Sequence, residues 1–248
     1  MRSPEELAEI GFQRSRVVIV NECHDGDRHS PRTRAIGRRI LAVAHEAGVR
    51  HLAMEALYEG FASEANATRR VPGIGLGYLA HDDMRALIGD ALALGWDLLS
   101  YECNFSLWNG GETRSAEFAN WRDAEEARNL TAFLARSPQD LKLLVWCGNS
   151  HQRKTPQTYP GVRRMTWIRL GQRLRELSGL DPFVIDQSVT VEYRRQRSPG
   201  RQDVKRYASE LRELGGTGGF LREEDPDARW RKDLSADAWL LSLDNLMV

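Results

Sequence analysis

The run at residues 16–25 constrains the fold of this 248-residue chain more than any other stretch. Four consecutive β-branched residues at 17–20 predict a short buried strand. Glu22, His24 and Asp25 follow at once, so titratable side chains stand where the strand ends. Active sites of α/β proteins lie at the carboxyl ends of their strands. We therefore interpret the run as part of a site at the edge of a sheet, rather than as a polar strand end in water.

A second strand is expected at 49–55, and it also ends in an acid, Glu55. Between the two strands, Ser30 and Pro31 predict the start of a helix, whose apolar residues recur at helical spacing as far as Gly48. Strands joined by such a helix run parallel to each other. The acid that ends each strand is therefore expected at the same edge of the sheet.

A further strand at 141–147 leads directly into Gly148, Asn149 and His151. We expect Gly148 to adopt backbone geometry that other residues resist, which would let a ligand or a loop approach closely. A histidine after a strand is usually an ordinary loop residue. His151 would share its sheet edge with Glu22, His24 and Glu55, which makes it a candidate for the same site.

The remaining pattern predicts one α/β domain over residues 1–248, with a central mostly parallel or mixed sheet flanked by helices. Additional helices are expected at 4–12, 81–94, 115–136 and 171–178, and additional strands at 96–102, 162–170, 182–186 and 238–243. The polar segment at about 195–235 contains a glycine run and an acidic run. We expect it to be a flexible insertion or lid with little structure.

The helix expected at 115–136 carries one apolar face and one charged face. The charged residues are Arg122, Asp123, Glu125, Glu126 and Arg128. We interpret most of them as a solvated face with ion pairs between neighbouring turns. Arg122 has two readings of similar weight, a helix-face salt bridge or a group that holds a substrate carboxylate or an anionic intermediate.

The composition excludes several classes of function. Lys and Arg together equal Asp and Glu, so the bulk charge attracts neither nucleic acid nor an anionic membrane. No segment is apolar enough to span a membrane, and the first fifteen residues do not form a secretory signal. We interpret the three cysteines, Cys23, Cys103 and Cys147, as small packing residues of a protein in a reducing compartment. The alternative is that one of them is a thiolate metal ligand or a nucleophile. We expect a cytoplasmic protein.

Three short stretches, at 21–25, 52–56 and 146–151, include the ends of the three strands that lead into the candidate site. They read Asn-Glu-Cys-His-Asp, Leu-Ala-Met-Glu-Ala and Trp-Cys-Gly-Asn-Ser-His, and the stretches 121–130, 170–179 and 237–241 support them. In this order the chain resembles the superfamily that joins erythromycin esterases, ChaN-like haem-binding lipoproteins and TraB/Tiki proteins. The resemblance covers most of the chain, and the Glu-x-His spacing at 22–24 is closer to the ChaN-like branch than to the esterases.

The resemblance implies a site made of Glu22, His24, Glu55 and His151. Two imidazoles and two carboxylates suffice for general acid–base hydrolysis. We expect His24 to act as the base, Glu55 or Glu22 to orient it, and His151 to be the second acid–base or oxyanion group. Candidate substrate-binding residues are Arg122, Arg34, Arg32 and Asn149. The expected substrate is an ester or amide in a small molecule or peptide.

Two other functions remain open at the same site. The four proposed catalytic residues could hold a divalent metal, since imidazole and carboxylate suit zinc or manganese, and the Tiki branch of the superfamily implies a metal-dependent peptidase. The ChaN-like branch implies a non-catalytic protein that binds haem or metal. We expect no cofactor or a divalent metal in preference to haem.

Overall fold

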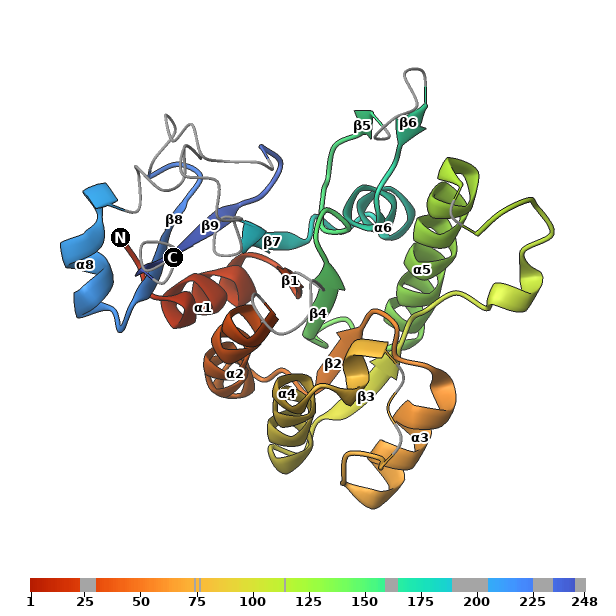
Figure 1. The fold of residues 1–248 in the computed structure, drawn as a ribbon, viewed down its shortest axis with the longest axis horizontal. Coiled ribbons are helices and arrows are strands. Elements are labelled where there is room, and N and C mark those ends of the chain that lie inside the picture. Colours follow the sequence, from red (N-terminus) through yellow and green to blue (C-terminus); the bar gives the residue numbers. More distant parts are fainter. Residues whose placement is uncertain are drawn as a thin grey trace.

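The computed structural model describes residues 1–22, 30–73, 75, 77–113, 115–158, 165–188, 205–224 and 234–243. They form a single α/β domain around a seven-stranded sheet in the order β3-β2-β4-β1-β7-β9-β8 (Figure 1). All neighbouring strands are parallel except β8 and β9. The strands are β1 Val17–Glu22, β2 His51–Met54, β3 Asp97–Ser100, β4 Leu143–Gly148, β7 Phe183–Asp186, β8 Thr217–Leu221 and β9 Ala238–Ser242, with β5 Gln157–Thr158 and β6 Thr166–Trp167 in a small second sheet. The expected fold class is confirmed.

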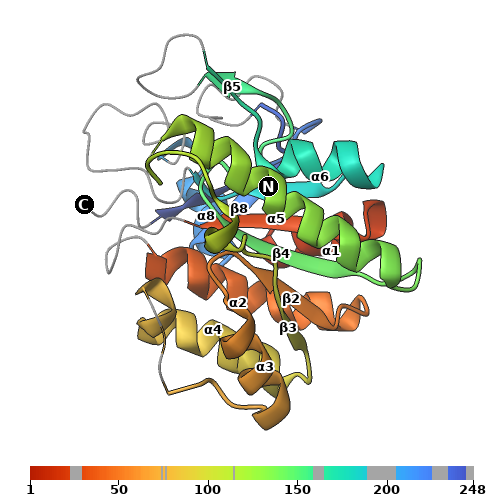
Figure 2. The same cartoon turned by 90° about the vertical axis from the view of Figure 1, so that its right-hand side faces the viewer.

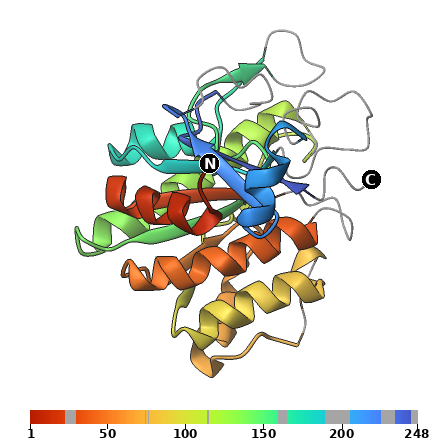
Figure 3. The ribbon, with the colours of Figure 1, turned by 90° about the vertical axis from the view of Figure 1, so that its left-hand side faces the viewer.

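Helices cover both faces of the sheet. Those of the described residues are α1 Pro4–Arg14, α2 Ser30–Glu46, α3 Glu59–Thr68, α4 Asp82–Ala93, α5 Ala116–Arg136, α6 Leu170–Ser178 and α8 Ala208–Glu213, with the short 3-10 helices η1 Gly77–Ala80 and η2 Phe105–Leu107. Figure 2 shows α5 and α6 on one face, and Figure 3 shows α1, α2 and α4 side by side on the other. None of the helices in these ranges is long and apolar enough to cross a membrane.

The pleat of the strands divides the core into two clusters, because successive side chains point to opposite faces. Toward α1, α2 and α4 the sheet contributes Val18, Val20, Met54, Leu144 and Trp146. Toward α5 and α6 it contributes Val17, Ile19, Ala53, Val145 and Cys147. The same alternation decides on which face each polar residue at the ends of the strands will lie.

Local sequence explains where several elements begin and how closely they pack. Ser3 and Glu6 form a reciprocal capping box at the start of α1. Gly37 lies inside α2, where glycine is normally unfavourable. A Cβ atom at this position would lie 2.5 Å from the ring of Trp146, so the glycine lets the indole pack against the helix.

The two edges of the sheet are covered by polar contacts. At β3, the Asn66 side chain donates to the Leu98 carbonyl and accepts from its amide, at 2.9 and 2.8 Å. At β8, the amide and carbonyl of Arg2 pair with the backbone of Gly219, at 2.9 and 2.8 Å. These contacts satisfy backbone groups that an open edge would leave available to another chain.

In the segment at 195–235, the described residues 205–224 form more regular structure than expected, and residues 195–204 and 225–233 lie outside the described residues. Within its described part, α8 packs beside β8, and all five residues of β8 are buried. A Cβ atom at Gly219 would lie 1.9 Å from the Trp239 carbonyl oxygen. The glycines that suggested flexibility therefore allow close pairing with β9. Helix α3 and the short length of β6 were not predicted either, whereas the last strand follows the sequence pattern.

Candidate functional site

The carboxyl ends of β1, β2 and β4 meet at one edge of the sheet. The register places Glu22 beside Gly148, and the Glu55 amide donates to the Trp146 carbonyl at 3.0 Å. The chain then leaves β1 for α2 on one face and leaves β4 for α6 on the other. Such a divergence is where open α/β sheets place their ligand sites.

Glu22 and Glu55 share this edge but lie on opposite faces of the sheet. Glu22 faces α2, where Arg34 donates to both of its oxygens, at 3.0 and 3.1 Å. The Trp146 indole donates to the same carboxylate at 2.7 Å, and Asp83 accepts from Arg34 at 2.9 Å. Glu22 and Arg34 are fully buried. Arg34, predicted as a substrate-binding residue, therefore binds Glu22 and Asp83 in this structure.

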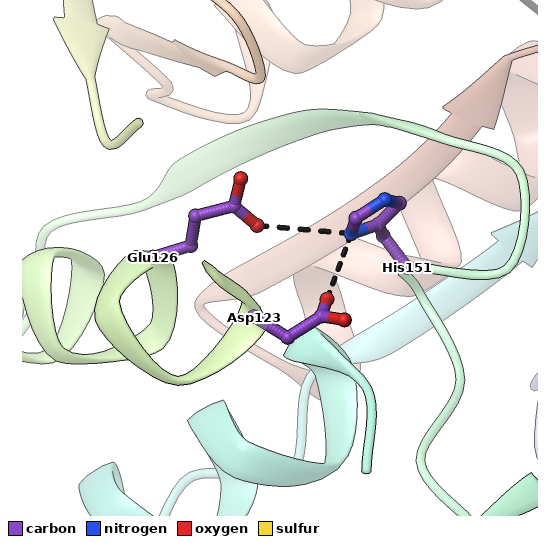
Figure 4. A group of neighbouring side chains, drawn as sticks. All are labelled: Asp123, Glu126 and His151. Atoms are coloured by element: carbon purple, nitrogen blue, oxygen red, sulfur yellow. Dashed lines mark hydrogen bonds and ion pairs between the residues drawn. The ribbon is translucent and has the colours of Figure 1, made fainter. Parts of the chain in front are cut away.

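His151 faces α5, where Asp123 holds its imidazole (Figure 4). The Nδ1 atom of His151 lies 2.7 Å from Asp123 Oδ1. Three further donors contact the same carboxylate, namely the Leu170 amide at 3.1 Å, the Trp167 indole at 2.8 Å and the Arg169 guanidinium at 2.7 Å. Asp123 is thus a fully buried acceptor whose position is fixed from three elements.

These contacts also determine the protonation of the pair. Burial would raise the pKa of Asp123, but His151 and Arg169 outweigh it and the pKa is lowered. An ionised carboxylate only accepts hydrogen bonds, so the proton between the two residues belongs to Nδ1 of His151. In the neutral imidazole this contact leaves the lone pair on Nε2, which is the tautomer a general base requires.

Glu55 lies on the other side of the imidazole. Its Oε1 atom lies 3.5 Å from His151 Nε2 and accepts from Arg122 at 2.9 Å. Its Oε2 atom accepts from the Gly148 amide at 2.5 Å. Asp123, His151 and Glu55 therefore form a line that leads from a buried carboxylate, through the imidazole, to a second carboxylate.

Arg122 joins Glu55 to two more acids. It donates to both oxygens of Glu102, at 2.9 and 2.5 Å, and its Nε atom lies 3.0 Å from Glu126 Oε1. Burial would lower the pKa of Arg122, but Glu55 and the other two acids raise it, so the guanidinium stays charged. The Arg122 side chain is 20% exposed and that of His151 is 13% exposed, whereas the acids are nearly covered. These two residues are what the site presents to solvent.

Left-handed backbone conformations stand beside both reactive groups. Ala56, after Glu55, has a φ of 58°, and Ser150, before His151, has a φ of 71°. Non-glycine residues rarely adopt such angles. Gly148 does not have a positive φ, so the expected special geometry belongs to Ser150 instead.

Helix α6 holds the turn that carries His151. The Gly171 amide donates to the His151 carbonyl at 2.9 Å. A Cβ atom at Gly171 would lie 2.1 Å from the Gln152 carbonyl oxygen. Arg169 donates through Nε to the Ser150 carbonyl at 2.9 Å. The start of α6 and this turn therefore fit only because position 171 carries no side chain.

The other sequence-predicted residues lie elsewhere. His24 falls outside the described residues, and its role stays a prediction. Asn149 accepts from the Asn21 side chain at 3.0 Å. Arg32 lies on α2 and is half-buried. The structure therefore brings together Glu55, Arg122 and His151 from the predicted set.

Sequence reasoning missed two central residues of the site. Asp123 and Glu126 are fully buried, so their interpretation as a solvated helix face is wrong. Their spacing carried a usable signal, because positions 123, 126, 127, 130 and 134 fall on the one buried stripe of α5. Glu102 is the last residue of the strand expected at 96–102, and the sequence assigned it no role.

The cysteines of the described residues are packing residues. Cys103 and Cys147 are buried and free. Burial raises the pKa of both thiols, so neither is a thiolate near neutral pH. The expectation of small buried side chains is confirmed for these two, and Cys23 lies outside the described residues.

Comparison with known proteins places the fold among bacterial effectors and a haem-binding protein. The type III effector HopBA1 matches with 13% identity and a TM-score of 0.52, over 96% of this chain and 92% of that chain. ChaN of Campylobacter jejuni, described with cofacial haem binding, matches with 11% identity and a TM-score of 0.50, over 94% and 90%. The chain shares its fold with these proteins. At such low identity the likeness extends to the fold alone.

A third match is to a longer toxin chain. RRSP, a MARTX toxin effector domain from Vibrio vulnificus CMCP6, matches with 14% identity and a TM-score of 0.51, over 77% of this chain. The present chain spans only 36% of the RRSP chain. No family model and no curated protein matches the sequence.

Metal binding can be judged from the donor set. In the described part of the chain, Asp123, Glu126 and His151 form a group whose ligand atoms lie within 4.8 Å of one another. Both oxygens of Asp123, however, already accept from four donors, including the Arg169 guanidinium. Glu55 likewise accepts from Arg122 and Gly148. A divalent cation would have to displace these donors, so Asp123 and Glu55 as they are held here do not fit a resident metal. Of the group, only Glu126 has two oxygens without a hydrogen-bond partner among the described residues.

Proposed function

We propose that the protein is a hydrolase that cleaves an ester or amide bond in a small molecule or peptide by Glu/His acid–base activation of water. The observation that supports this most directly is the line Asp123–His151–Glu55, with distances of 2.7 and 3.5 Å on the two sides of the imidazole. A buried carboxylate that fixes the tautomer of a histidine is the arrangement that makes it an effective base.

In this mechanism His151 Nε2 takes a proton from a water molecule that attacks the substrate carbonyl. The imidazolium that forms is stabilised by Asp123, whose charge lies against Nδ1. The imidazolium of His151 then gives this proton to the leaving group. Glu55 lies too far from Nε2 for a direct hydrogen bond, at 3.5 Å, and would orient the water between them. Arg122, partly exposed beside Glu55, would stabilise the negative charge on the carbonyl oxygen.

In this mechanism Glu22 would support the site without exchanging protons itself. Three donors from Arg34 and Trp146 hold its carboxylate. Such contacts anchor the end of β1 rather than leave an acid ready to exchange protons. His24, two residues further along the chain, remains a candidate for the second imidazole of the reaction.

The test is hydrolysis of a panel of p-nitrophenyl esters and of fluorescent casein by matched variants. His151→Gln and Glu55→Gln should each lower kcat by about 10²–10⁴-fold, because each removes a proton-transfer or positioning group. His51→Gln, at the opposite end of β2, should retain wild-type turnover and controls for the substitution. Retention of turnover in folded His151→Gln would exclude the mechanism.

The alternatives give different results in the same preparation. A metal-dependent peptidase would lose turnover with EDTA and regain it with zinc or manganese. A haem-binding protein would show a Soret band after titration with haemin, and His151→Gln would abolish it. We expect EDTA to leave the rate unchanged, because a cation beside His151 would have to displace the donors that hold Asp123 and Glu55.

A further inference from the structure

Glu126 is the residue of the site whose role the mechanism above leaves open. It lies on α5 one helical turn after Arg122 and Asp123, and its side chain is completely buried. Its Oε1 atom lies 3.0 Å from Arg122 Nε, and its Oε2 atom lies 3.7 Å from His151 Nδ1 (Figure 4). It therefore stands between the guanidinium and the imidazole of the proposed reaction.

The surroundings of Glu126 are rich in negative charge. The titratable and charged groups that face it are Glu55 after β2, Tyr101, Glu102 and Cys103 after β3, Cys147 on β4, His151 after β4, Arg122 and Asp123 on α5, and Arg169 before α6. Three of these are carboxylates, against two guanidiniums. A fourth buried carboxylate would be uncompensated, and such groups bind a proton instead. Burial and then Glu55 and its neighbours raise the pKa of Glu126 far above its ordinary value.

A protonated carboxyl group has contacts here that a carboxylate lacks. Neither oxygen of Glu126 has a hydrogen-bond partner among the described residues, and a proton on one of them can be donated to Glu102, whose pKa Glu126 lowers. Its other oxygen can still accept from Arg122. A neutral acceptor orients the guanidinium without cancelling its charge, whereas a carboxylate at the same distance would add a third negative partner to Glu55 and Glu102.

We propose that Glu126 is a positioning residue that holds Arg122 and Glu102 as a neutral carboxylic acid, so that Arg122 keeps its positive charge for the anion formed during hydrolysis. The role of Arg122 in this statement rests on the proposed function. The neutral state of Glu126 does not, because it follows from burial and from the charges around it.

Two substitutions separate a neutral acid from a carboxylate. Glu126→Gln keeps the shape, a donor for Glu102 and an acceptor for Arg122, whereas Glu126→Leu keeps only the volume. We expect the leucine variant to lower kcat/KM on the best p-nitrophenyl ester by about tenfold or more, since Arg122 and Glu102 lose a buried partner. The glutamine variant should restore most of that loss. Glu125→Gln, one residue away on the partly exposed face, is the matched control.

Two outcomes would overturn the proposal. Equal losses in the two Glu126 variants would mean that the residue acts as a carboxylate or transfers a proton. No loss in the leucine variant would mean that it does not position Arg122.

A measurement without substrate keeps this proposal separate from the proposed function. The folded protein retains a proton on Glu126 that the unfolded chain releases above about pH 4.5, its ordinary pKa. The stability that Glu126 provides is therefore complete below that pH and is lost as the pH rises toward the native pKa. Urea unfolding should show the wild type weakening relative to Glu126→Gln by up to about tenfold in the unfolding constant per pH unit. A difference that does not change with pH would overturn the neutral state even in an inactive protein.

Discussion

Asp123→Asn tests the buried end of the proposed catalytic line. The substitution keeps the shape of the side chain but removes the charge that faces Arg169, whose side chain is 1% exposed. Breaking a buried ion pair costs about 3–5 kcal/mol. Arg169 keeps its contacts with the Ser150 carbonyl and hydroxyl, so we expect the lower end, about 3 kcal/mol. The asparagine amide can also present a donor to His151, which favours the tautomer with the proton on Nε2. That change should lower kcat by about 10³–10⁴-fold.

The assays are urea unfolding followed by circular dichroism and hydrolysis of the best ester. The pKa of Asp123 is lowered in the native protein, so its stabilising effect is present above its unfolded pKa of about 3.8 and disappears as the pH falls through the native value. The variant should therefore be weaker at pH 7 and approach the wild type in acid. Asp90→Asn, in an exposed pair with Arg38, is the control. A loss below 1 kcal/mol together with unchanged turnover would refute the reasoning.

Two further substitutions test the contacts that position the site. Gly171→Ala should destabilise the fold by about 1–3 kcal/mol, measured by urea unfolding, because its Cβ atom would meet the Gln152 carbonyl oxygen at 2.1 Å; unchanged stability would contradict the packing. Arg34→Met should cost about 3–5 kcal/mol in the same assay, because Glu22 would remain buried without its cation, whereas the exposed Arg38→Met should cost less than about 1 kcal/mol. Equal losses at the two arginines would show that Glu22 is not dependent on its partner.

The order of strands and helices could be predicted because it depends on local patterns. Consecutive β-branched residues and helical spacing sufficed for β1 and α2. The topology rule for strands joined by a helix then placed Glu22 and Glu55 at one edge. The rule does not predict on which face of the pleated sheet each side chain lies. The alternation of side chains between the two faces continues past the end of each strand. It places Glu22 on the face toward α2 and Glu55 on the face toward α5, so the sheet separates two acids that share an edge.

The composition of the site was harder to predict for a different reason. A charged residue on an amphipathic helix is usually solvated, and this expectation is correct for Glu125 and Arg128. Asp123 and Glu126 contradict it, because tertiary partners from distant segments compensate their burial. Their partners lie mainly beyond position 150 or before position 103, and no local pattern connects them. The strand at Thr217–Leu221 was missed similarly, since its glycines acquire their meaning only against Trp239.

The left-handed residues Ala56 and Ser150 have a consequence for how this protein can be engineered. Each holds about 1–2 kcal/mol of backbone strain immediately beside a reactive side chain. A search for thermostable variants will therefore favour glycine at these two positions. The same changes make the backbone that positions Glu55 and His151 more flexible. Selection for heat resistance alone should therefore yield a more stable protein with a less organised site.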